Sequence, residues 1–123
     1  MRIVATTPEY RPTWLHRDVL DRIWRASGSP YVASWHRAPI FPDWFLYEGA
    51  TPVAFRTADM SFGMLLGAPS VYFIDGRHRT RWLMERFELV PVGLEEHHFG
   101  EATTVGLAVR PVDPEDTFPT FDY

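Results

Sequence analysis

The sequence predicts a small α+β protein built around a mixed sheet. Runs of β-branched and aromatic residues, typical of strands, alternate with two segments whose apolar residues recur at helical spacing. Glycine and proline separate these segments at short intervals. The chain has 123 residues, enough for one domain with a hydrophobic core. We expect this domain over residues 1–110, followed by a proline-rich acidic tail over residues 111–123.

The first half of the chain is predicted to contain one helix and several short strands. Residues 14–26 carry apolar side chains on one helical face, after Thr13 as N-cap and before Gly28 as a stop. Pro39 and Pro42 exclude a regular helix between them. Strands are expected over residues 2–6, 31–35, 44–47 and 52–56.

The second half is predicted to form a strand–helix–strand (βαβ) unit. A strand over residues 71–74 leads through a turn into a helix over residues 77–87, and a second strand follows at residues 89–94. Because the connections are short, the two strands are expected to be parallel neighbours. The remaining predictions are loops over residues 57–70 and 95–104 and a last strand over residues 105–110. The tail is expected either to lie along the body or to be disordered.

Composition excludes several classes of chemistry and of partner. The chain has no cysteine, which removes disulfides, thiolate nucleophiles and cysteine-based zinc sites. All 12 basic residues are arginine, so catalytic lysine chemistry is also absent. The net charge of −4 argues against nonspecific coating of nucleic acid, and no apolar run is long enough to span a membrane. A cytoplasmic location is expected, because the N-terminus does not resemble a signal peptide.

Asp75 and Gly76 end the strand predicted over residues 71–74, and a dense basic cluster opens the next helix. Three of the 12 arginines lie between positions 77 and 81. Cations are disfavoured at a helix N-terminus, whereas free backbone N–H groups bind anions there, so the cluster predicts a bound anion. The predicted phosphate- or nucleotide-binding residues are Gly76, Arg77, His78, Arg79, Thr80 and Arg81.

Four residues of this turn have specific expected roles. Gly76 would let a ligand approach the backbone, and Arg79 would grip a phosphate with two N–H groups. His78 could donate to a phosphate oxygen or act as a general acid–base. Asp75 is expected to cap the helix near His78, with binding of a divalent cation as the alternative.

Other polar residues are candidate additions to this site. Arg77 and Arg81 lie one helical turn apart, so we expect them to share a face and to extend the cationic surface. Asp59 and Ser61, in the predicted loop, could reach the same pocket. The run Glu95-Glu96-His97-His98 has metal-ligand residue types, but adjacent residues of an extended loop point in alternate directions. A solvated loop is therefore favoured there, and no metal site is predicted.

Two stretches of sequence carry a family resemblance. Residues 73–83 read Phe-Ile-Asp-Gly-Arg-His-Arg-Thr-Arg-Trp-Leu, and residues 90–94 read Val-Pro-Val-Gly-Leu. This pattern resembles the ParB/sulfiredoxin superfamily, whose members place Gly-x-His-Arg or Gly-x-Arg-Arg between a strand and a helix. Together with Met-Ser-Phe-Gly at residues 60–63, it is most similar to the plasmid fertility inhibition factors. The resemblance covers roughly residues 53–95.

The resemblance implies an α+β fold that binds ATP, with Mg²⁺ as companion ion, through Gly76, His78 and Arg79. Related proteins hydrolyse nucleoside triphosphates and some cut DNA, which implies an ATPase and nuclease with Asp75, His78 and Arg79 as catalytic residues. Fertility inhibition factors block transfer of a competing plasmid through a type IV secretion apparatus. The implied partners are therefore a nucleotide, DNA and a conjugative transfer or coupling protein. Arg77 stands where sulfiredoxins place their catalytic cysteine, so reduction of sulfinic acids is excluded.

Three functional hypotheses stay open. The first is the ATPase and nuclease, in which His78 and Arg79 hold phosphates and Asp75 helps to position a metal ion. The second is a non-catalytic module that inhibits a transfer or coupling protein by docking. The third is structural, with the arginines paired to Glu95, Glu96 or the acidic tail and no small ligand. We expect Arg79→Ala to abolish nucleotide binding and to leave the fold intact.

Overall fold

Two β-sheets of different size form the framework of the protein. The computed structural model describes residues 1–28, 30–35 and 42–118. The smaller sheet has the order β1-β4-β3, with strands β1 (Arg2–Val4), β3 (Phe45–Glu48) and β4 (Thr51–Arg56). The larger sheet has the order β6-β5-β7-β2-β8, with strands β2 (Tyr10–His16), β5 (Asp59–Leu65), β6 (Ala68–Phe73), β7 (Leu89–Glu95) and β8 (Ala108–Pro111).

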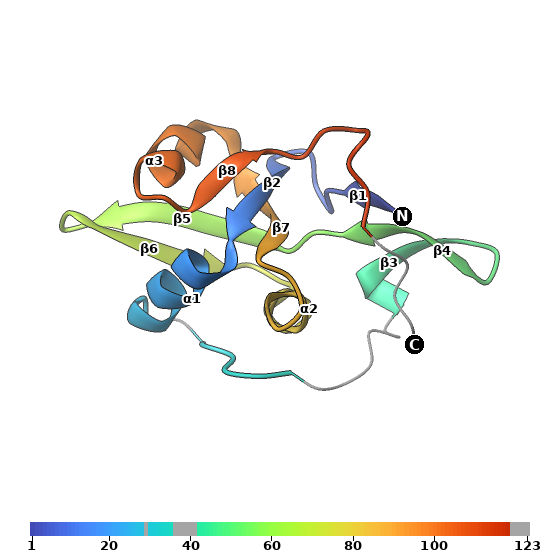
Figure 1. Cartoon of the computed structure of the whole chain (residues 1–123), viewed down its shortest axis with the longest axis horizontal. Helices are drawn as coiled ribbons and strands as arrows, with labels where there is room; N and C mark the ends of the chain where they lie inside the picture. Colours follow the sequence, from blue (N-terminus) through green and yellow to red (C-terminus); the bar gives the residue numbers. More distant parts are fainter. Residues whose placement is uncertain (29, 36–41, 119–123) are drawn as a thin grey trace.

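Helices pack around the larger sheet. In the described residues these are α1 (Arg17–Ala26), α2 (Arg77–Met84) and α3 (Phe99–Thr104), with the short 3₁₀ helix η2 (Glu96–His98) before α3. A second 3₁₀ helix, η1 (Pro42–Trp44), lies against β3 and β4 of the smaller sheet. Figure 1 draws α1 and α2 beneath the strands and α3 above them, beside β8. None of these helices is long and apolar enough to cross a membrane. One hydrophobic core joins both sheets, and its largest buried side chains include Trp24, Phe45, Phe55 and Phe62. The predicted α+β class with mixed sheets is confirmed.

Helix α1 begins at Arg17, three residues later than predicted. Residues 14–16 instead extend β2, which pairs antiparallel with β7 on one side and with β8 on the other. Strand pairing overrides the helical spacing because it gives these backbone groups hydrogen-bond partners in two neighbouring strands. The apolar face of the rest of the helix is as predicted, with Leu20, Ile23 and Trp24 buried.

The loop predicted over residues 57–70 is wrong, because most of it forms a β-hairpin. Strand β5 pairs antiparallel with β6 from Met60, opposite Phe73, to Leu65, opposite Ala68. Leu66 and Gly67 connect the two strands and have positive φ angles of 51° and 80°. Two-residue hairpin turns of this kind need such angles. The Gly and Ser residues of this segment weaken the strand signal, although Met60 and Phe62 of β5 are buried in the core.

The strand–helix–strand order around Gly76 is confirmed, but its two strands are neither parallel nor neighbours. Strand β5 lies between them, antiparallel to β6 and parallel to β7. The parallel pair is therefore β5 and β7, whose register places Asp59 opposite Gly93. The error follows from the missed strand, since an earlier strand can insert between two later ones without changing their order along the chain.

Several shorter predictions also need correction. Residues 31–35 are irregular and do not form a strand. The segment 95–104, predicted as a loop, contains the end of β7, then η2 and α3. Helix α2 ends at Met84 and strand β8 begins at Ala108, so both elements are shorter than expected. Pro39 lies outside the described residues.

The described part of the C-terminal segment, up to Phe118, lies along the body. Phe118 is 5% exposed and packs edge-on against Trp14, with ring centroids 5.5 Å apart. The amino group of Met1 donates to the Phe118 carbonyl at 2.8 Å, and the Phe118 N–H donates to the Met1 carbonyl at 2.9 Å. Residues 119–123 lie outside the described residues.

Candidate functional site

Gly76 joins the end of β6 to α2 in a conformation and a space that favour glycine. Its φ is 74°, in the left-handed region. A Cβ atom at this position would lie 2.6 Å from Ala58 Cβ and 2.6 Å from Arg79 Cζ. The space beside the Gly76 backbone, where a ligand was expected, is thus filled by Ala58 and Arg79 of the protein itself. Thr80 donates to the Gly76 carbonyl from its backbone N–H at 3.0 Å and from Oγ1 at 2.9 Å, which fixes the first turn of the helix.

Arg79 is buried and links α2 to the connection between β4 and β5. The residue is 5% exposed. Its Nε donates to the Arg56 carbonyl at 3.0 Å and its Nη2 donates to the Thr57 carbonyl at 3.1 Å, while Asp75 Oδ2 lies 3.6 Å from Nη2. Burial lowers the pKa of Arg79 from its usual value, and the Asp75 carboxylate opposes that shift. The guanidinium therefore has an internal structural role.

Arg81 is also buried and engaged inside the protein. Its Nη2 donates to Asp21 Oδ1 at 2.6 Å, and its guanidinium carbon lies 5.2 Å from the Trp24 ring centroid and 5.1 Å from that of Tyr31. Burial alone would raise the pKa of Asp21, but hydrogen bonds from Tyr31 and Arg81 lower it below its usual value. Since Arg77 is exposed and Arg81 is 7% exposed, the two do not form a shared cationic face.

Asp75 does not cap α2, contrary to the prediction. Its Oδ1 instead accepts the backbone N–H of Asp59 at 2.9 Å. Gly76 takes the N-cap position, so the first turn of α2 has no side-chain cap, and it contains no acidic residue. The helix start therefore keeps its backbone donors and its partial positive charge without a side-chain acceptor from the cap position.

Arg77 and His78 are the basic side chains of the turn that reach its surface. Arg77 is exposed, and His78 is half-buried with its ring centroid 4.1 Å from that of Trp35. The two buried arginines of the turn are balanced by Asp75 and Asp21. The structural hypothesis therefore described their internal pairing correctly but named the wrong acidic partners. A role of the turn in phosphate binding stays a prediction.

Asp59 reaches the turn, as expected, although it does so from strand β5. The residue is 5% exposed, and its Oδ1 has no hydrogen-bond partner in the described part of the chain. Burial raises the pKa of Asp59 to about 6; the Asp75 carboxylate contributes to the rise and Arg79 opposes it. A buried carboxyl group that titrates near neutral pH is typical of functional sites. Ser61 lines a separate hollow on the β5–β6 hairpin.

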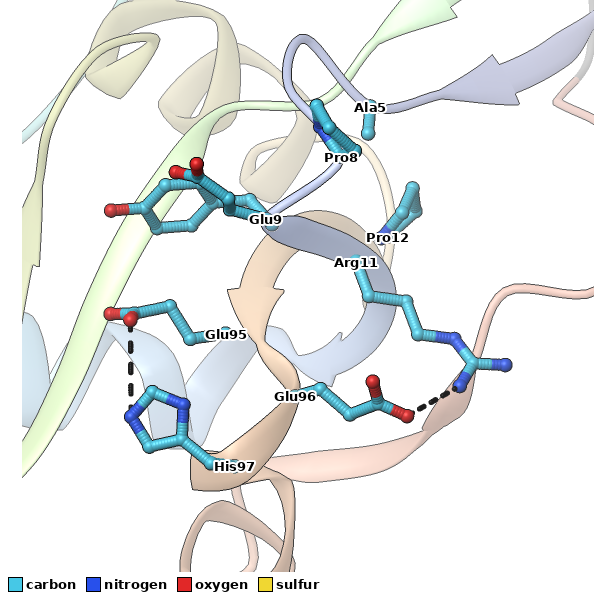
Figure 2. A pocket seen from close by; sticks show the side chains of 9 residues that line it. Ala5, Pro8, Glu9, Arg11, Pro12, Glu95, Glu96 and His97 are labelled. Atoms are coloured by element: carbon cyan, nitrogen blue, oxygen red, sulfur yellow. Dashed lines mark hydrogen bonds and ion pairs between the residues drawn. The ribbon is translucent and has the colours of Figure 1, made fainter.

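An open pocket of about 490 Å³ lies near Asp59, where β2 begins and β7 ends (Figure 2). Gly93 of β7 lies close to both Tyr10, a pocket residue, and Asp59. A Cβ added at Gly93 would lie 3.0 Å from Tyr10 Cβ and 3.3 Å from Asp59 Oδ1. Burial raises the pKa of Tyr10, and the carboxylates of Glu95 and Asp59 raise it further. The pocket is lined by Ala5, Pro8, Glu9, Tyr10, Arg11, Pro12, Glu95, Glu96 and His97.

Glu95, His97 and His98 converge at the end of β7, where a 3₁₀ helix takes the place of the predicted loop. One ligand atom from each residue lies within 4.8 Å of the others. Figure 2 shows the Glu95 carboxylate and the His97 ring on the same side of the pocket, with His97 Nε2 3.9 Å from Glu95 Oε2. The strand ends at Glu95 and a 3₁₀ helix follows, so adjacent side chains no longer alternate as they would in an extended loop.

Glu9 and Tyr10 are pocket residues that the sequence does not single out. Both fall between Pro8 and Pro12, outside the strands predicted from the sequence. Only the pairing of β2 with β7, which sets Tyr10 opposite Glu95, brings them to the pocket. No local signal in the sequence points to that pairing. The His-His pair, by contrast, was visible from its residue types.

The fold has a known counterpart. No protein-family model and no curated protein matches the chain by sequence. The structure is similar to the crystal structure of an oncogenic suppression activity protein, described as a plasmid fertility inhibition factor and solved as a gold(I) cyanide derivative. The TM-score is 0.56 at 20% sequence identity, and the match covers 89% of this chain and 63% of that one. The chain has the fold of this fertility inhibition factor.

The resemblance drawn from residues 53–95 is therefore confirmed at the level of the fold. A likeness at 20% identity establishes the fold alone. The chain also spans 63% of the length of the protein that it matches, so the activity of that protein does not transfer with its fold.

Proposed function

We propose that the chain acts as a plasmid fertility inhibition factor, which blocks conjugative transfer of DNA through a type IV secretion apparatus. Its proposed ligand is the phosphate of a nucleotide or of DNA, bound at the start of α2. The observation that carries this proposal is the uncapped first turn of α2 on a fold similar to that of a fertility inhibition factor. Free backbone N–H groups at a helix start are a general anion-binding device.

The structure changes which side chains are proposed to hold the phosphate. Arg77 is exposed on the first turn, and His78 is its half-buried neighbour. Arg79 and Arg81, by contrast, donate to carbonyl and carboxylate oxygens of the protein. We therefore assign phosphate contact to Arg77 and His78 and a supporting role to the two buried arginines. This arrangement favours binding over turnover, because Asp75 and Arg79 are already engaged with Asp59 and backbone groups.

A second candidate function is hydrolysis of ATP or cleavage of DNA. The buried Asp59 favours it, since a carboxyl group with a pKa of about 6 can accept and return a proton at neutral pH. Asp75 stands beside it with its side chain 45% exposed, and carboxylate oxygens are the ligands that Mg²⁺ prefers. In this version ATP and Mg²⁺ would bind between the start of α2 and the two carboxylates.

Calorimetric titration with ATP and Mg²⁺ tests the proposed site. We expect the parent protein to bind, Arg77→Ala to bind about tenfold more weakly because a charge-assisted contact is lost, and Arg22→Ala to bind like the parent. Arg22 is a matched control, since it is an exposed arginine on α1. A parent that does not bind, or equal binding by the parent and Arg77→Ala, would contradict the phosphate site.

A conjugation assay with the same three proteins tests the biological role. Expression of the parent in donor cells is expected to reduce transfer of a competing plasmid. Weaker inhibition by Arg77→Ala would link inhibition to the helix start, and unchanged inhibition would show that docking alone suffices. Release of ADP by the parent, lost in Asp59→Asn, would favour the enzyme. No reduction of transfer by the parent would refute the proposed role.

A further inference from the structure

The end of β7 carries a cluster that the proposed function does not use. Glu95 is the last residue of the strand, and His97 and His98 belong to the 3₁₀ helix η2 that follows. One ligand atom of each lies within 4.8 Å of the other two. Imidazole nitrogen and carboxylate oxygen are common ligands of divalent transition metals, especially Zn²⁺.

The spacing of the three groups is close to what a metal ion requires. With bonds of 2.0–2.1 Å in tetrahedral geometry, two ligand atoms on Zn²⁺ are about 3.3 Å apart. His97 Nε2 lies 3.9 Å from Glu95 Oε2, and the rings of His97 and His98 have centroids 4.0 Å apart. The three ligand atoms lie within 4.8 Å of one another, so the side chains must move closer to share one ion. Adjacent residues of a 3₁₀ helix are 120° apart, so the side-by-side arrangement of these two rings is not a consequence of their positions in the chain.

His98 has a carboxylate close to one of its ring nitrogens. Its Nδ1 is buried and has no hydrogen-bond partner in the described part of the chain, but Glu101 Oε1 of α3 lies 3.7 Å away. Metal-binding histidines usually donate their second ring N–H to a carboxylate, which fixes the tautomer and the ring orientation. A small closure would give His98 this contact and leave Nε2 for the metal. Phe62 packs edge-on against the same ring at 6.1 Å and restricts its movement.

The cluster is also open to solvent and to other ligands. The His97 side chain is 68% exposed, and Glu95 and His97 both line the pocket of Figure 2. Three protein ligands leave at least one coordination position on the metal for water or for a bound group. Such an open set is typical of reactive metal sites, whereas structural zinc sites use four protein ligands.

We propose that Glu95, His97 and His98 bind a divalent transition metal, with Zn²⁺ as the ion that tests the site, and that Glu101 positions His98. This site lies at the end of β7 and is separate from the phosphate site proposed at the start of α2. Its occupancy does not depend on nucleotide binding, so the two proposals can fail independently.

Titration of the whole chain with Zn²⁺, followed by calorimetry, tests the proposal. We expect one Zn²⁺ per chain for the parent and for His16→Ala, and loss of this binding in His97→Ala. His16 is an exposed histidine at the far end of β2, so its replacement controls for nonspecific binding to imidazole. Because His97 is mostly exposed, its replacement should leave the far-ultraviolet circular dichroism unchanged. No binding by the parent, or equal binding by the parent and His97→Ala, overturns the site.

Two further measurements separate the metal ligands from their support. Co²⁺ in place of Zn²⁺ is expected to give a visible absorption band in the parent that is lost in His97→Ala and in Glu95→Gln. Glu101→Gln should keep the band but weaken Zn²⁺ binding by about tenfold, as expected when the acceptor for a ligating histidine is lost. A band that persists in both ligand variants overturns the site, and undiminished affinity of Glu101→Gln overturns the positioning role.

Discussion

Two charged clusters stand out in the sequence, and in the fold one is largely buried whereas the other is largely exposed. At the start of α2, Arg79 and Arg81 turn inward and become buried links to backbone carbonyls and to Asp21. At the end of β7, Glu95 and His97 stay at the surface and line an open pocket. The cluster with the stronger sequence signal is therefore the more structural one.

The difference lies in the length of the side chains and in what surrounds them. An arginine can reach across a helix and bury its stem while its head finds several acceptors. The acceptors here come from segments far away in the sequence, namely the β4–β5 connection and α1. A histidine side chain is shorter and reaches fewer distant acceptors. His97 at the end of β7 therefore keeps its ring at the surface, where a ring nitrogen can bind a ligand. A dense run of charged residues thus says little about function until it is known which of their side chains pair inside the protein.

Arg79→Ala is expected to have the largest effect, in contrast to the expectation from the sequence that it would leave the fold intact. It tests whether this buried arginine is structural. The substitution would leave the carbonyls of Arg56 and Thr57 without their buried donor. It would also remove the positive charge that lies beside the Asp75 carboxylate. We expect the free energy of unfolding to fall by about 3 kcal/mol, measured by urea denaturation. The exposed Arg77→Ala is the control and should change it by less than about 0.5 kcal/mol. Equal effects of the two substitutions would remove the distinction between inward and outward arginines.

Gly76→Ala should have the next largest effect, and it tests how tightly the turn is packed. The new Cβ would lie 2.6 Å from Ala58 Cβ and from Arg79 Cζ, and the alanine would have to adopt a positive φ. We expect a loss of about 2 to 3 kcal/mol in thermal or urea unfolding. Gly67→Ala is a matched control, since its φ is 80° with no atom within 4 Å of the added Cβ, and should cost about 1 kcal/mol. If both substitutions lower the free energy of unfolding equally, the close packing of Ala58 and Arg79 against Gly76 does not restrict the residue at this position.

Asp59→Asn is expected to have the smallest effect and the opposite sign. The pKa of Asp59 is about 6 in the folded chain, against about 3.9 in an unfolded one. The folded state therefore binds more protons between these values, so the stabilising contribution is complete below about pH 4 and is lost as the pH rises through 6. Replacing the carboxylate by an amide should raise the free energy of unfolding at pH 7 by about 1 kcal/mol.

Urea denaturation of the parent and Asp59→Asn at several pH values measures this effect. The difference between the two proteins should grow from pH 4 to pH 7. A constant difference over that range would mean that Asp59 is not held in an unfavourable charged state beside Asp75.

The sequence predicted those elements whose pattern is local. The apolar face of α1, strand β4 and strand β7 follow from side-chain spacing and β-propensity, and the structure has them close to the expected residues. Strand β5 was missed because its Gly and Ser residues weaken the strand signal and its identity depends on pairing with β6 and β7. That single omission also produced the wrong neighbours for β6 and β7.

The candidate site was predictable to a similar degree. Gly76 and its unusual backbone, and the approach of Asp59 to the turn, could be expected from the residues themselves. The internal partners of Arg79 and Arg81 could not, since they come from other segments. Tyr10 reaches its pocket only through the pairing of β2 with β7. Local chemistry was visible in the sequence, whereas the choice between an internal and an external partner depends on the tertiary fold.

The mutual hydrogen bonds of Met1 and Phe118 have a consequence for the order of folding. They join residues 117 positions apart, among the largest separations that the described chain offers. Loop closure costs more entropy as the loop grows, and contacts of long sequence separation form slowly. The β5–β6 hairpin, by contrast, closes through a two-residue turn. We therefore expect the hairpin to assemble early and the docking of Phe118 onto the core to be among the last steps.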